Sequence, residues 1–506
     1  MAIHHLDFSN LRTPGPSFRL LTDAGASHPF PIRGDLYAQL AQDARQFFYL
    51  QRSGCAIDEA RAPGYGRPAG HFGVPPNTGD TAVPAWTGPD AERLYPGWRE
   101  DGRFDVTGGW YDAGDHGKYV TSGALPTWQL LATVELLRRH GADPAEQSAL
   151  LEECRWQLDW LLRMQLPDGH PYAGLAFHRV HGSTWEPEVV WPHLDATTRV
   201  LHRPSTGAAL GLAAVAAQAA RIFADPDPSY ASTLVEASTR AFRSAHDQPR
   251  LLAPDDRGKF GGGPYFDDDL DDDFYWAAAE LWLTTGAEPY LRALRESPLH
   301  QAEVFDLDGF DFDRVAAPAR LDLALSRRPM PDHDQFAESA LSAASRLVEL
   351  QGQQGWEQPY APGPVWDWGS NGRLLSNLVV LGTAYELTGA SDFLDAVLTG
   401  IDYLFGRNGL GQSYVTGYGT DFSQHQRTRH FAHDHDPAFP SPPRGSLAGG
   451  PTNQAYPDFP DDPRLPDLPP QCAYLDQPSS ETTNDICIRW NAPLVWVATF
   501  LTVTGR

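Results

Sequence analysis

Long stretches with apolar residues at helical spacing recur along almost the whole chain, and they restrict its fold more than any other feature. The first begins at Asp35, a suitable cap, and places Leu36, Leu40, Ala44 and Phe47 three or four residues apart. Comparable stretches follow at 125–141, 150–165, 205–223, 273–286, 339–351, 371–389, 391–406 and 491–505. About eleven or twelve helices with almost no alternating strand pattern predict an all-α fold.

The ends of these stretches indicate how the helices are arranged. "LTTG" at 283–286 and "ELTG" at 386–389 close two of them in nearly the same way, each with a glycine of the kind that ends helices. This repetition is typical of helical hairpins. The largest irregular segment, 407–485, is rich in Gly, Pro, His and Asp, and long loops on a helical scaffold usually carry function. We therefore expect a ring of helical hairpins whose site is built from loops at one end.

Charge excludes several classes of partner. The chain has 39 basic and 65 acidic residues, a formal net charge of −26, whereas nucleic acids and anionic membranes both require a basic face. We find no run of 18 apolar residues, so no membrane span is expected. Four cysteines without CxxC spacing argue against a disulfide scaffold. Because the first residues lack a signal-peptide pattern, we expect a cytoplasmic protein, or a secreted one from which a signal peptide was removed.

"GGWYDAGDHGKYV", from Gly108 to Val120, is the first candidate site. Asp112 and Asp115 lie three residues apart with only Ala and Gly between them. Two such carboxylates can share one water, one orienting it and the other taking its proton. The same spacing also fits an Asx-turn that leads into a helix, so the residues alone leave both interpretations open.

"DDDLDDDF" at 267–274 allows a metal-binding interpretation. Asp267, Asp268 and Asp271 satisfy the DDxxD pattern that chelates Mg²⁺-diphosphate in all-helical isoprenoid enzymes. Such sites also need basic residues around the diphosphate, and this neighbourhood is acidic. An acidic helix start, favoured by the helix dipole, or a Ca²⁺ loop fits better.

Two further segments carry titratable clusters. His430, His433 and His435 in "HQRTRHFAHDHD" are candidate metal ligands, but no paired Cys or Glu spacing accompanies them. Asp476, Glu481 and Asp485 precede the last helical stretch. An acid there is either a helix cap or, if burial raises its pKa, a proton donor.

Several of these segments together resemble glycoside hydrolase family 9, the inverting cellulases. "GGWYDAGDHGKYV" resembles the signature of that family, and six further motifs occur in the family's order. The resemblance covers about 35 to the end, and it implies an (α/α)₆ barrel at 35–506 with long loops forming a cleft that hydrolyses β-1,4-glycosidic bonds. The motifs are "FFYLQRSG", "GGGPYFDDDLDDDFYWAAAELWLTTG", "WDWGSNGRLLSNLVVLGTAYELTG", "LFGRNGLGQSYVTGYG", "GSLAGGPTNQAYPDFPDD" and "NDICIRWNAPLV".

The resemblance implies roles for the acidic residues. Asp115 corresponds to the general base, and Asp112 helps to hold the water. Asp485 stands where the family has a glutamate acid, and its side chain is one methylene shorter. Glu481, one turn earlier where the family usually has Tyr, is the alternative acid. The register of Asp485 depends on four matching residues: Asn484, Ile488, Trp490 and Asn491.

Sugar contacts are also implied, because pyranose faces stack on aromatic rings. We expect them from four aromatic residues and from the two ends of "HQRTR", which replaces a family segment like "HPHHR". Because the central histidines of that segment are absent, the substrate stays open between β-1,4-glucans, as for a cellulase, and short oligosaccharides, as for an intracellular exo-β-glucosidase or exo-β-glucosaminidase. The changed residue at the acid position leaves open a third function, a non-catalytic sugar-binding relative that has lost its acid. The candidate contacts are Trp366, Trp368, Tyr414, Tyr418, His425 and Arg429.

The remaining expectations concern the N-terminus and cofactors. Residues 1–34 resemble the last strands of the immunoglobulin-like domain that precedes many family members, which predicts a remnant packed on the barrel. No cofactor is expected. The family's zinc pattern is largely missing, because Ser53 stands in place of a Cys and only Cys55 and His71 remain nearby. A structural Ca²⁺ held by loop acids stays open, as does the oligomeric state.

Overall fold

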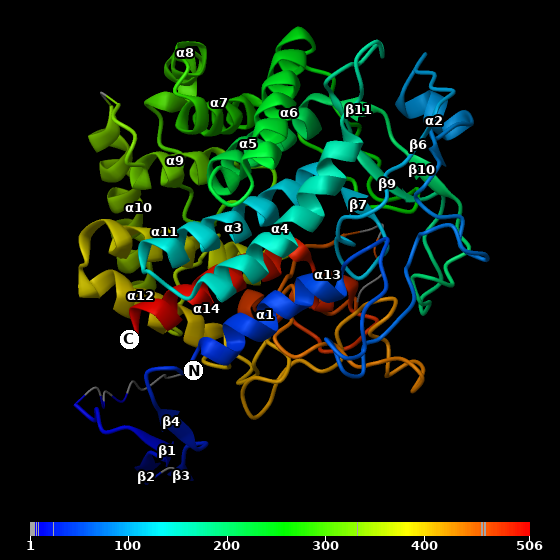
Figure 1. Cartoon of the computed structure of the whole chain (residues 1–506). Coiled ribbons are helices and arrows are strands. Elements are labelled where there is room, and N and C mark those ends of the chain that lie inside the picture. Colours follow the sequence, from blue (N-terminus) through cyan, green and yellow to red (C-terminus); the bar gives the residue numbers. More distant parts are fainter. Residues whose placement is uncertain are drawn as a thin grey trace.

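Two concentric rings of α-helices form the body of the protein in a computed structural model, which describes residues 6, 8, 10–23, 25–330, 332–456, 459 and 462–505 (Figure 1). Each inner helix packs against the next, and the last packs against the first, so the inner ring closes. The predicted (α/α)₆ barrel is confirmed. The inner helices are α3 (Val120–Arg139), α5 (Thr206–Phe223), α7 (Asp271–Thr285), α9 (Ala316–Leu325), α11 (Ser370–Thr388) and α14 (Ile488–Thr504).

Each inner helix has one outer helix packed against it. The hairpin pairs are α14 with α1, α3 with α4, α5 with α6, α7 with α8, α9 with α10, and α11 with α12. The outer helices are α1 (Ala38–Leu50), α4 (Pro144–Met164), α6 (Pro228–Asp247), α8 (Glu288–Glu296), α10 (His333–Gln353) and α12 (Ser391–Leu404).

The residue pattern decides which helices lie inside. Every residue of α5 except Arg221 is buried, as expected of a helix that is apolar on all sides. By length and composition α5 could cross a membrane, but 94% of it is buried inside the barrel. In α6, by contrast, buried residues such as Leu234, Ser238 and Phe242 lie on one side of the helix. An outer helix such as α6 buries one face, whereas the inner helix α5 is buried on nearly all sides. The core therefore lies between the two rings and inside the inner ring.

Local signals set the helix ends. Asp143 and Asp227 accept hydrogen bonds from the backbone N–H of Ala145 and Tyr230, at 2.8 and 3.1 Å, and cap α4 and α6. The "LTTG" and "ELTG" segments end α7 and α11 at glycines in the left-handed conformation, with φ of 67° and 69°. These endings confirm the helix C-caps predicted from the glycines.

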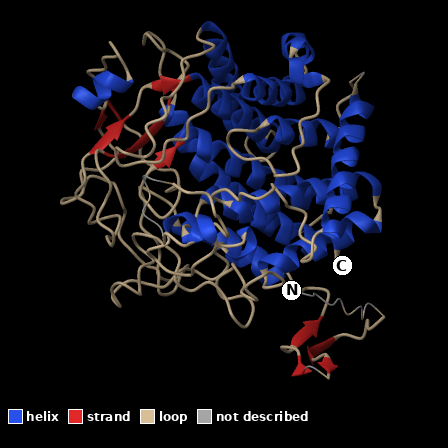
Figure 2. Cartoon of the chain, turned by 180° about the vertical axis from the view of Figure 1, so that it is seen from behind, coloured by secondary structure: helices blue, strands red, loops and turns tan. Residues whose placement is uncertain are grey.

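Loops and short strands gather on one side of the helical body (Figure 2). The strands form a three-stranded sheet, β7 next to β9 next to β10, and the pairs β8–β11 and β5–β6. Two short helices, α2 (Pro89–Leu94) and α13 (Glu481–Asn484), lie among the loops. The strands are β5 (Val83–Pro84), β6 (Arg103–Phe104), β7 (Lys118–Tyr119), β8 (Ala176–Phe177), β9 (Arg179–Gly182), β10 (Arg199–Leu201) and β11 (Pro204–Ser205), and the 3₁₀ helices are η1 (Pro298–His300), η2 (Leu465–Asp467) and η3 (Pro470–Cys472).

The N-terminal segment forms two antiparallel strand pairs, β1 with β4 and β2 with β3. Both views show these strands set apart from the rings, so the expectation that they pack on the barrel is wrong (Figures 1 and 2). None of their residues is fully buried, because strands this short cannot form a core. Residues 1–5, 7, 9 and 24 lie outside the described residues. The strands are β1 (Gly15–Phe18), β2 (Leu21–Thr22), β3 (Gly25–Ala26) and β4 (Phe30–Ile32).

Candidate active site

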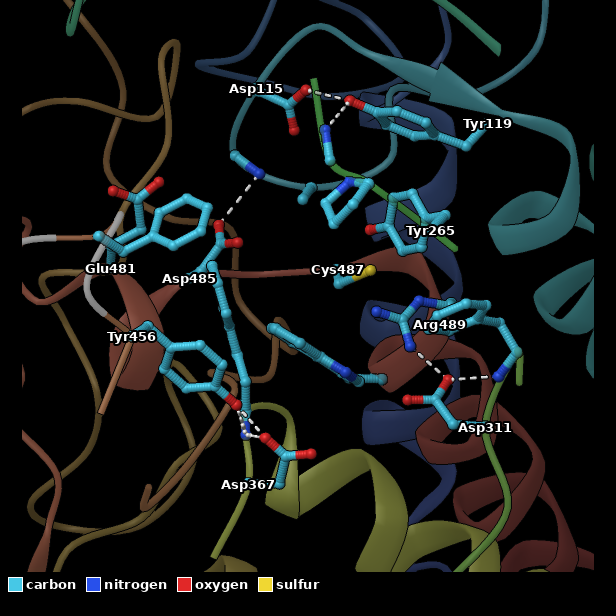
Figure 3. A pocket seen from close by; sticks show the side chains of 18 of the residues that line it. Asp115, Tyr119, Tyr265, Asp311, Asp367, Tyr456, Glu481, Asp485, Cys487 and Arg489 are labelled. Atoms are coloured by element: carbon cyan, nitrogen blue, oxygen red, sulfur yellow. Dashed lines mark hydrogen bonds and ion pairs between the residues drawn. The ribbon is translucent and has the colours of Figure 1, made fainter. Parts of the chain in front are cut away.

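A cleft of about 540 Å³ opens at the end of the barrel where the inner helices begin. Loops that precede all six inner helices contribute to its walls, and the long segment between α12 and α13 completes it. The predicted position of a site at one end of the ring, built from loops, therefore agrees with the structure. Figure 3 shows the side chains that point into the cleft.

Asp115 lies in the cleft wall on the loop before α3. Its Oδ2 accepts hydrogen bonds from the backbone N–H of Gly117 at 2.8 Å and from the hydroxyl of Tyr119 at 3.2 Å. Tyr119 is itself fixed, because its Oη accepts a hydrogen bond from the backbone N–H of Gly263 at 2.8 Å. Since both hydrogen bonds reach Oδ2, Oδ1 is the oxygen best placed to accept a proton from a water in the cleft.

Asp112 is not among the residues that line the cleft. It is 1% exposed, and its Oδ1 accepts a 2.5 Å hydrogen bond from the Ser122 hydroxyl, while the Tyr265 hydroxyl donates to its Oδ2. Burial and the charge of Asp115 raise its pKa to about 6, against the attraction of Arg489. Asp112 therefore does not face the cleft as Asp115 does: it lies behind Tyr265, and its two oxygens accept hydrogen bonds from the hydroxyls of Ser122 and Tyr265.

Asp485 comes into the cleft from the opposite end of the sequence, between α13 and α14. Its Oδ1 accepts hydrogen bonds from the backbone N–H groups of Gly114, at 3.1 Å, and Ile486, at 2.9 Å. The residue at 114 must be small: a Cβ there would lie 2.8 Å from Asp485 Oδ1 and 2.4 Å from the carbonyl oxygen of Arg427. The "DAGD" glycine therefore allows the loop of Asp115 and the loop of Asp485 to touch.

Asp485 and Glu481 have different electrostatic surroundings. Burial raises the pKa of Asp485 well above its ordinary value, and the charges of Glu481 and Asp115 raise it further, while Arg427 lowers it. Glu481 instead forms an ion pair with Arg427, with 3.2 Å between Oε2 and Nη2. The first arrangement favours a protonated carboxyl and the second an ionised one.

Of the four aromatic residues predicted to bind sugar, only Trp368 lines the cleft. Trp366 is buried edge-on against Tyr360, and Tyr414 is fully buried. Tyr418 donates a 2.7 Å hydrogen bond to Asp43 on α1. For these three the expectation of sugar contact is wrong, because their rings are used in packing or face an outer helix.

The two end residues of "HQRTR", His425 and Arg429, differ in their position relative to the cleft. Arg429 lines the cleft, and its backbone N–H donates a 2.8 Å hydrogen bond to the carbonyl of Gly114. His425 does not line it, and its Nδ1 lies 2.6 Å from Oδ2 of the exposed Asp434. The expected sugar contact of His425 is therefore wrong, because its ring pairs with a carboxylate outside the cleft. Asp476 holds the same segment by accepting the backbone N–H of Gln424 at 2.8 Å.

Sequence reasoning missed several aromatic residues of the cleft: Trp185, Tyr265, Tyr456 and Phe459. Trp185 is anchored by a 2.9 Å hydrogen bond from its Nε1 to the carbonyl of Gly258. The ring of Phe459 lies 5.1 Å from that of Trp368, centroid to centroid. The available signal was an aromatic residue within a long Gly- and Pro-rich loop, which applies to too many residues to select these.

Arg489 was also missed, although it lies within the motif "NDICIRWNAPLV" that contains Asp485. It lines the cleft and pairs with Asp311, and its guanidinium lies 5.1 Å from the centre of the Tyr265 ring. Arg489 is a half-buried positive charge that acts on the pKa of Asp112. Figure 3 shows it next to Tyr265.

The acidic run before α7 forms a compact group of potential metal ligands. Oxygens of Asp267, Asp272 and Asp273 lie within 4.8 Å of one another, so the DDxxD set of Asp267, Asp268 and Asp271 is not the one brought together. Asp273 is 5% exposed, and its Oδ2 has no hydrogen-bond partner among the described residues. Three carboxylates with an unused buried oxygen fit a hard cation such as Ca²⁺.

The histidine candidates do not form a comparable group. His430 is buried against Phe431, His433 donates from Nδ1 to the carbonyl of Phe439 at 2.9 Å, and His435 is exposed. None of the three belongs to a cluster of potential ligands found in the described part of the chain. The metal interpretation of this segment is therefore not supported.

His71 belongs to a second buried cluster. Its Nε2 lies 3.2 Å and Nδ1 of His116 lies 3.1 Å from the same oxygen, Oδ2 of Asp195. Cys55 is not part of this cluster, and all four cysteines are free, in line with the expected absence of a disulfide scaffold. The shared aspartate links the two histidines by hydrogen bonds behind the loop of Asp115.

Known proteins match both the sequence and the fold of this chain. The model of glycosyl hydrolase family 9 matches residues 37–498. The chain belongs to this family. It is 46% identical to endoglucanase C of Cellulomonas fimi, covering 100% of this chain and 47% of that protein, and 37% identical to cellulose 1,4-beta-cellobiosidase of Acetivibrio thermocellus, covering 99% and 61%. The chain thus spans about half to three fifths of the length of these relatives.

Solved structures of family 9 proteins agree with this assignment. The structure of AaCel9A in complex with cellobiose-like isofagomine superimposes with a TM-score of 0.84 at 25% identity, covering 99% of this chain and 92% of that one. The family 9 fold therefore extends over nearly the whole chain.

Proposed function

We propose that this family 9 member hydrolyses β-1,4-glycosidic bonds of cellulose-type glucans or cello-oligosaccharides with inversion at the anomeric carbon. The observation that carries the proposal is the meeting of Asp115 and Asp485 in one cleft, joined through Gly114, with surroundings that favour a proton on Asp485. The names of the relatives, an endoglucanase and a cellobiosidase, support a glucan substrate.

The chemistry assigned to the two carboxyls is a single displacement. Asp115 takes a proton from a water, whose oxygen forms a bond to the anomeric carbon from one face of the sugar. Asp485 gives its proton to the glycosidic oxygen as the bond from that oxygen to the anomeric carbon breaks. The base gains a proton and the acid loses one, so exchange with solvent restores both. A raised pKa suits the acid, because a carboxyl that is already ionised has no proton to give.

Asp485 is a better candidate for the acid than Glu481. Glu481 is paired with Arg427, and an adjacent positive charge favours the ionised form of a carboxylate. Asp485 has the raised pKa and the direct link to the loop of Asp115. Asp112, behind Tyr265, acts on the water through its charge and through the Tyr265 hydroxyl.

Aromatic side chains of the cleft supply the sugar-binding surfaces. Trp368, Tyr456 and Phe459 lie together at one side, with ring centroids of Tyr456 and Phe459 at 5.5 and 5.1 Å from that of Trp368. Trp185 and Arg429 lie in the same cleft, and Arg429 offers donors to sugar hydroxyls. This combination of flat apolar faces and charged donors fits a neutral oligosaccharide.

We also propose that the carboxylates of Asp267, Asp272 and Asp273 bind a structural Ca²⁺ at the start of α7. The buried and unpartnered Oδ2 of Asp273 supports this proposal. The ion would neutralise three adjacent negative charges and fix the loop that leads from Tyr265 to α7.

Product analysis tests the function. We expect wild type to release sugars from carboxymethylcellulose or cello-oligosaccharides, and the first product to be the α anomer by NMR. Asp115→Asn and Asp485→Asn should each lose at least about 10²-fold in kcat, since general acid–base catalysis contributes roughly 10² to 10⁴. A matched control is Asp434→Asn, an exposed acid outside the cleft.

The pattern of products distinguishes the alternatives. Rapid loss of viscosity with mixed oligomers indicates cleavage within the chain, whereas single sugars from short oligomers alone indicate exo action. Activity on chitosan oligosaccharides alone would contradict a glucan substrate. Binding of cello-oligosaccharides without any hydrolysis would contradict the enzymatic proposal and favour a sugar-binding protein.

A further inference from the structure

Arg427 lies between two carboxylates in the wall of the cleft. Its Nη1 is 3.1 Å from Oε1 of Glu188, and its Nη2 is 3.2 Å from Oε2 of Glu481. The side chains of Arg427 and Glu481 are only 14% and 20% exposed, and both line the cleft that contains Asp485. A pair this shielded from solvent is stronger and better fixed than an ion pair on the open surface.

The backbone fixes this ion pair relative to Asp485. Arg427 pairs with Asp485 as a parallel β-bridge, and its N–H donates a 2.9 Å hydrogen bond to the carbonyl of Asn484. Glu481 lies one helical turn before Asp485, whose N–H donates to the Glu481 carbonyl at 3.3 Å. These contacts fix the backbone of Arg427 and of Glu481 next to Asp485.

Three charged groups act on the pKa of Asp485 from the elements around it. Glu481 on α13 and Asp115 on the loop before α3 raise its pKa, and Arg427 on the segment between α12 and α13 lowers it. Cys487, two residues further on, is buried, and its own pKa is raised by burial. Among the neighbouring charges, Glu481 therefore raises the pKa of Asp485 the most, and only burial has a larger effect. Glu481 also forms an ion pair with Arg427.

We propose that Glu481, held in place by Arg427, is a positioning residue whose ionised carboxylate keeps the proton on Asp485 until the leaving oxygen takes it. The inference rests on the proposed function, in which Asp485 is the acid. It gives one physical reason why Asp485, Glu481 and Arg427 meet in the wall of one cleft. The charge of Glu481 adds to burial in favouring the proton on Asp485, and the 3.2 Å ion pair with Arg427 holds the Glu481 carboxylate in place.

The test is the pH profile of kcat for variants of the pair on a soluble glucan. Glu481→Gln should move the alkaline limb down by about one pH unit, while the rate at the acidic plateau stays within about threefold of wild type. Arg427→Gln should move the limb up, because it removes the positive charge that opposes the proton on Asp485. Arg427→Lys, which keeps the charge, should leave the limb near its wild-type position. Opposite shifts from two partners of one ion pair cannot arise from a merely structural role.

Glu188→Gln is the matched control, because Glu188 pairs with the same arginine but does not line the cleft. It should leave the alkaline limb within about 0.3 of a unit, as expected of a half-exposed carboxylate outside the site. An alkaline limb that does not move in Glu481→Gln would overturn the proposal. Loss of activity at every pH in Glu481→Gln, equal to that of Asp485→Asn, would also overturn it and make Glu481 the acid.

A second measurement separates this inference from the proposed function. The infrared band of the protonated Asp485 carboxyl, obtained as the difference between wild type and Asp485→Asn, can be followed with pH without any substrate. Its midpoint should fall in Glu481→Gln and rise in Arg427→Gln. Unchanged midpoints would contradict the inference even in an active enzyme, whereas shifted midpoints in a protein that hydrolyses no glucan would contradict only the proposed function.

Discussion

At the residue scale, the glycine of "DAGD" matters as much as the two aspartates. Gly114 is the point where the loop of Asp115 contacts the loop of Asp485, and the hydrogen bond between them joins residues 371 positions apart. The sequence showed that Asp112 and Asp115 flank two small residues, but not what approaches them. It could not reveal that Asp112 is covered by Tyr265, because that contact joins segments 153 positions apart.

Gly114→Ala should therefore damage catalysis. The added Cβ would lie 2.4 Å from the Arg427 carbonyl and 2.8 Å from Asp485 Oδ1, so the acid loop must move away. We expect kcat to fall by about 10²-fold, the effect of a displacement of about 1 Å. Steady-state kinetics measure this. Gly352→Ala on α10, where a Cβ meets nothing within 4 Å, is the control and should be close to wild type. Equal activity in both variants would contradict the role given to Gly114.

Asp112 predicts a pH dependence of stability. Its pKa is raised from 3.8 to about 6 by burial and by Asp115, so the folded protein holds this proton more tightly than the unfolded chain. The stabilisation is complete below pH 4 and is lost as pH rises towards 6, by about 2 to 3 kcal/mol. Urea unfolding of wild type and Asp112→Asn between pH 4 and 7 measures it. The variant should show a shallower decrease, and parallel curves would contradict the assignment.

At the scale of elements, the inner helices and the cleft were predictable to different degrees. Continuous apolar stretches such as α5 predicted the helices, and glycine endings such as Gly286 indicated that they form hairpins. The loops were not predictable in the same way, because their conformations depend on contacts between distant segments. Tyr414 and Trp366 illustrate this: an aromatic residue in a loop sequence gives no sign of whether its ring faces the cleft or the core.

The acidic start of α7 allows a test by metal removal. We expect Ca²⁺ to raise the melting temperature of the EDTA-treated protein by a few degrees, since a ligand at 100 times its Kd adds about 2.7 kcal/mol. Asp273→Asn should abolish this rise. Asp271→Asn, in the same turn but outside the ligand group, should keep it. Calorimetry with and without Ca²⁺ measures both, and an equal response of the two variants would contradict the proposed ligands.

At the scale of the whole molecule, the ring is closed by the two ends of the helical sequence. α14 packs against α3, α1 and α11, so the last helix completes the inner ring and covers the first outer helix. The family resemblance gave this closure, whereas the helix count alone was compatible with any arrangement of hairpins. The N-terminal strands take no part in the ring (Figures 1 and 2).

Truncation should affect the two ends differently. Ending the chain at Asn484 removes Asp485 and α14, and we expect no cooperative thermal transition, because the apolar faces of α1, α3 and α11 lose their common partner. Removing residues 1–33 should leave the melting temperature within a few degrees. Calorimetry of the two truncated chains measures the difference. A cooperative transition in the chain that lacks α14 would show that the ring does not need its closing helix.

The position of Asp485 also has a consequence for synthesis of the protein. A ribosome completes most of the polypeptide, including five of the six inner helices, before the proposed acid leaves the exit tunnel. The loop of Asp115 is synthesised early and lacks Asp485 until the end, because Asp115 and Asp485 meet only where α3 packs against α14. Hydrolytic activity should therefore arise only once α14 has been made and has closed the inner ring, so that no partly made barrel can act on a glucan.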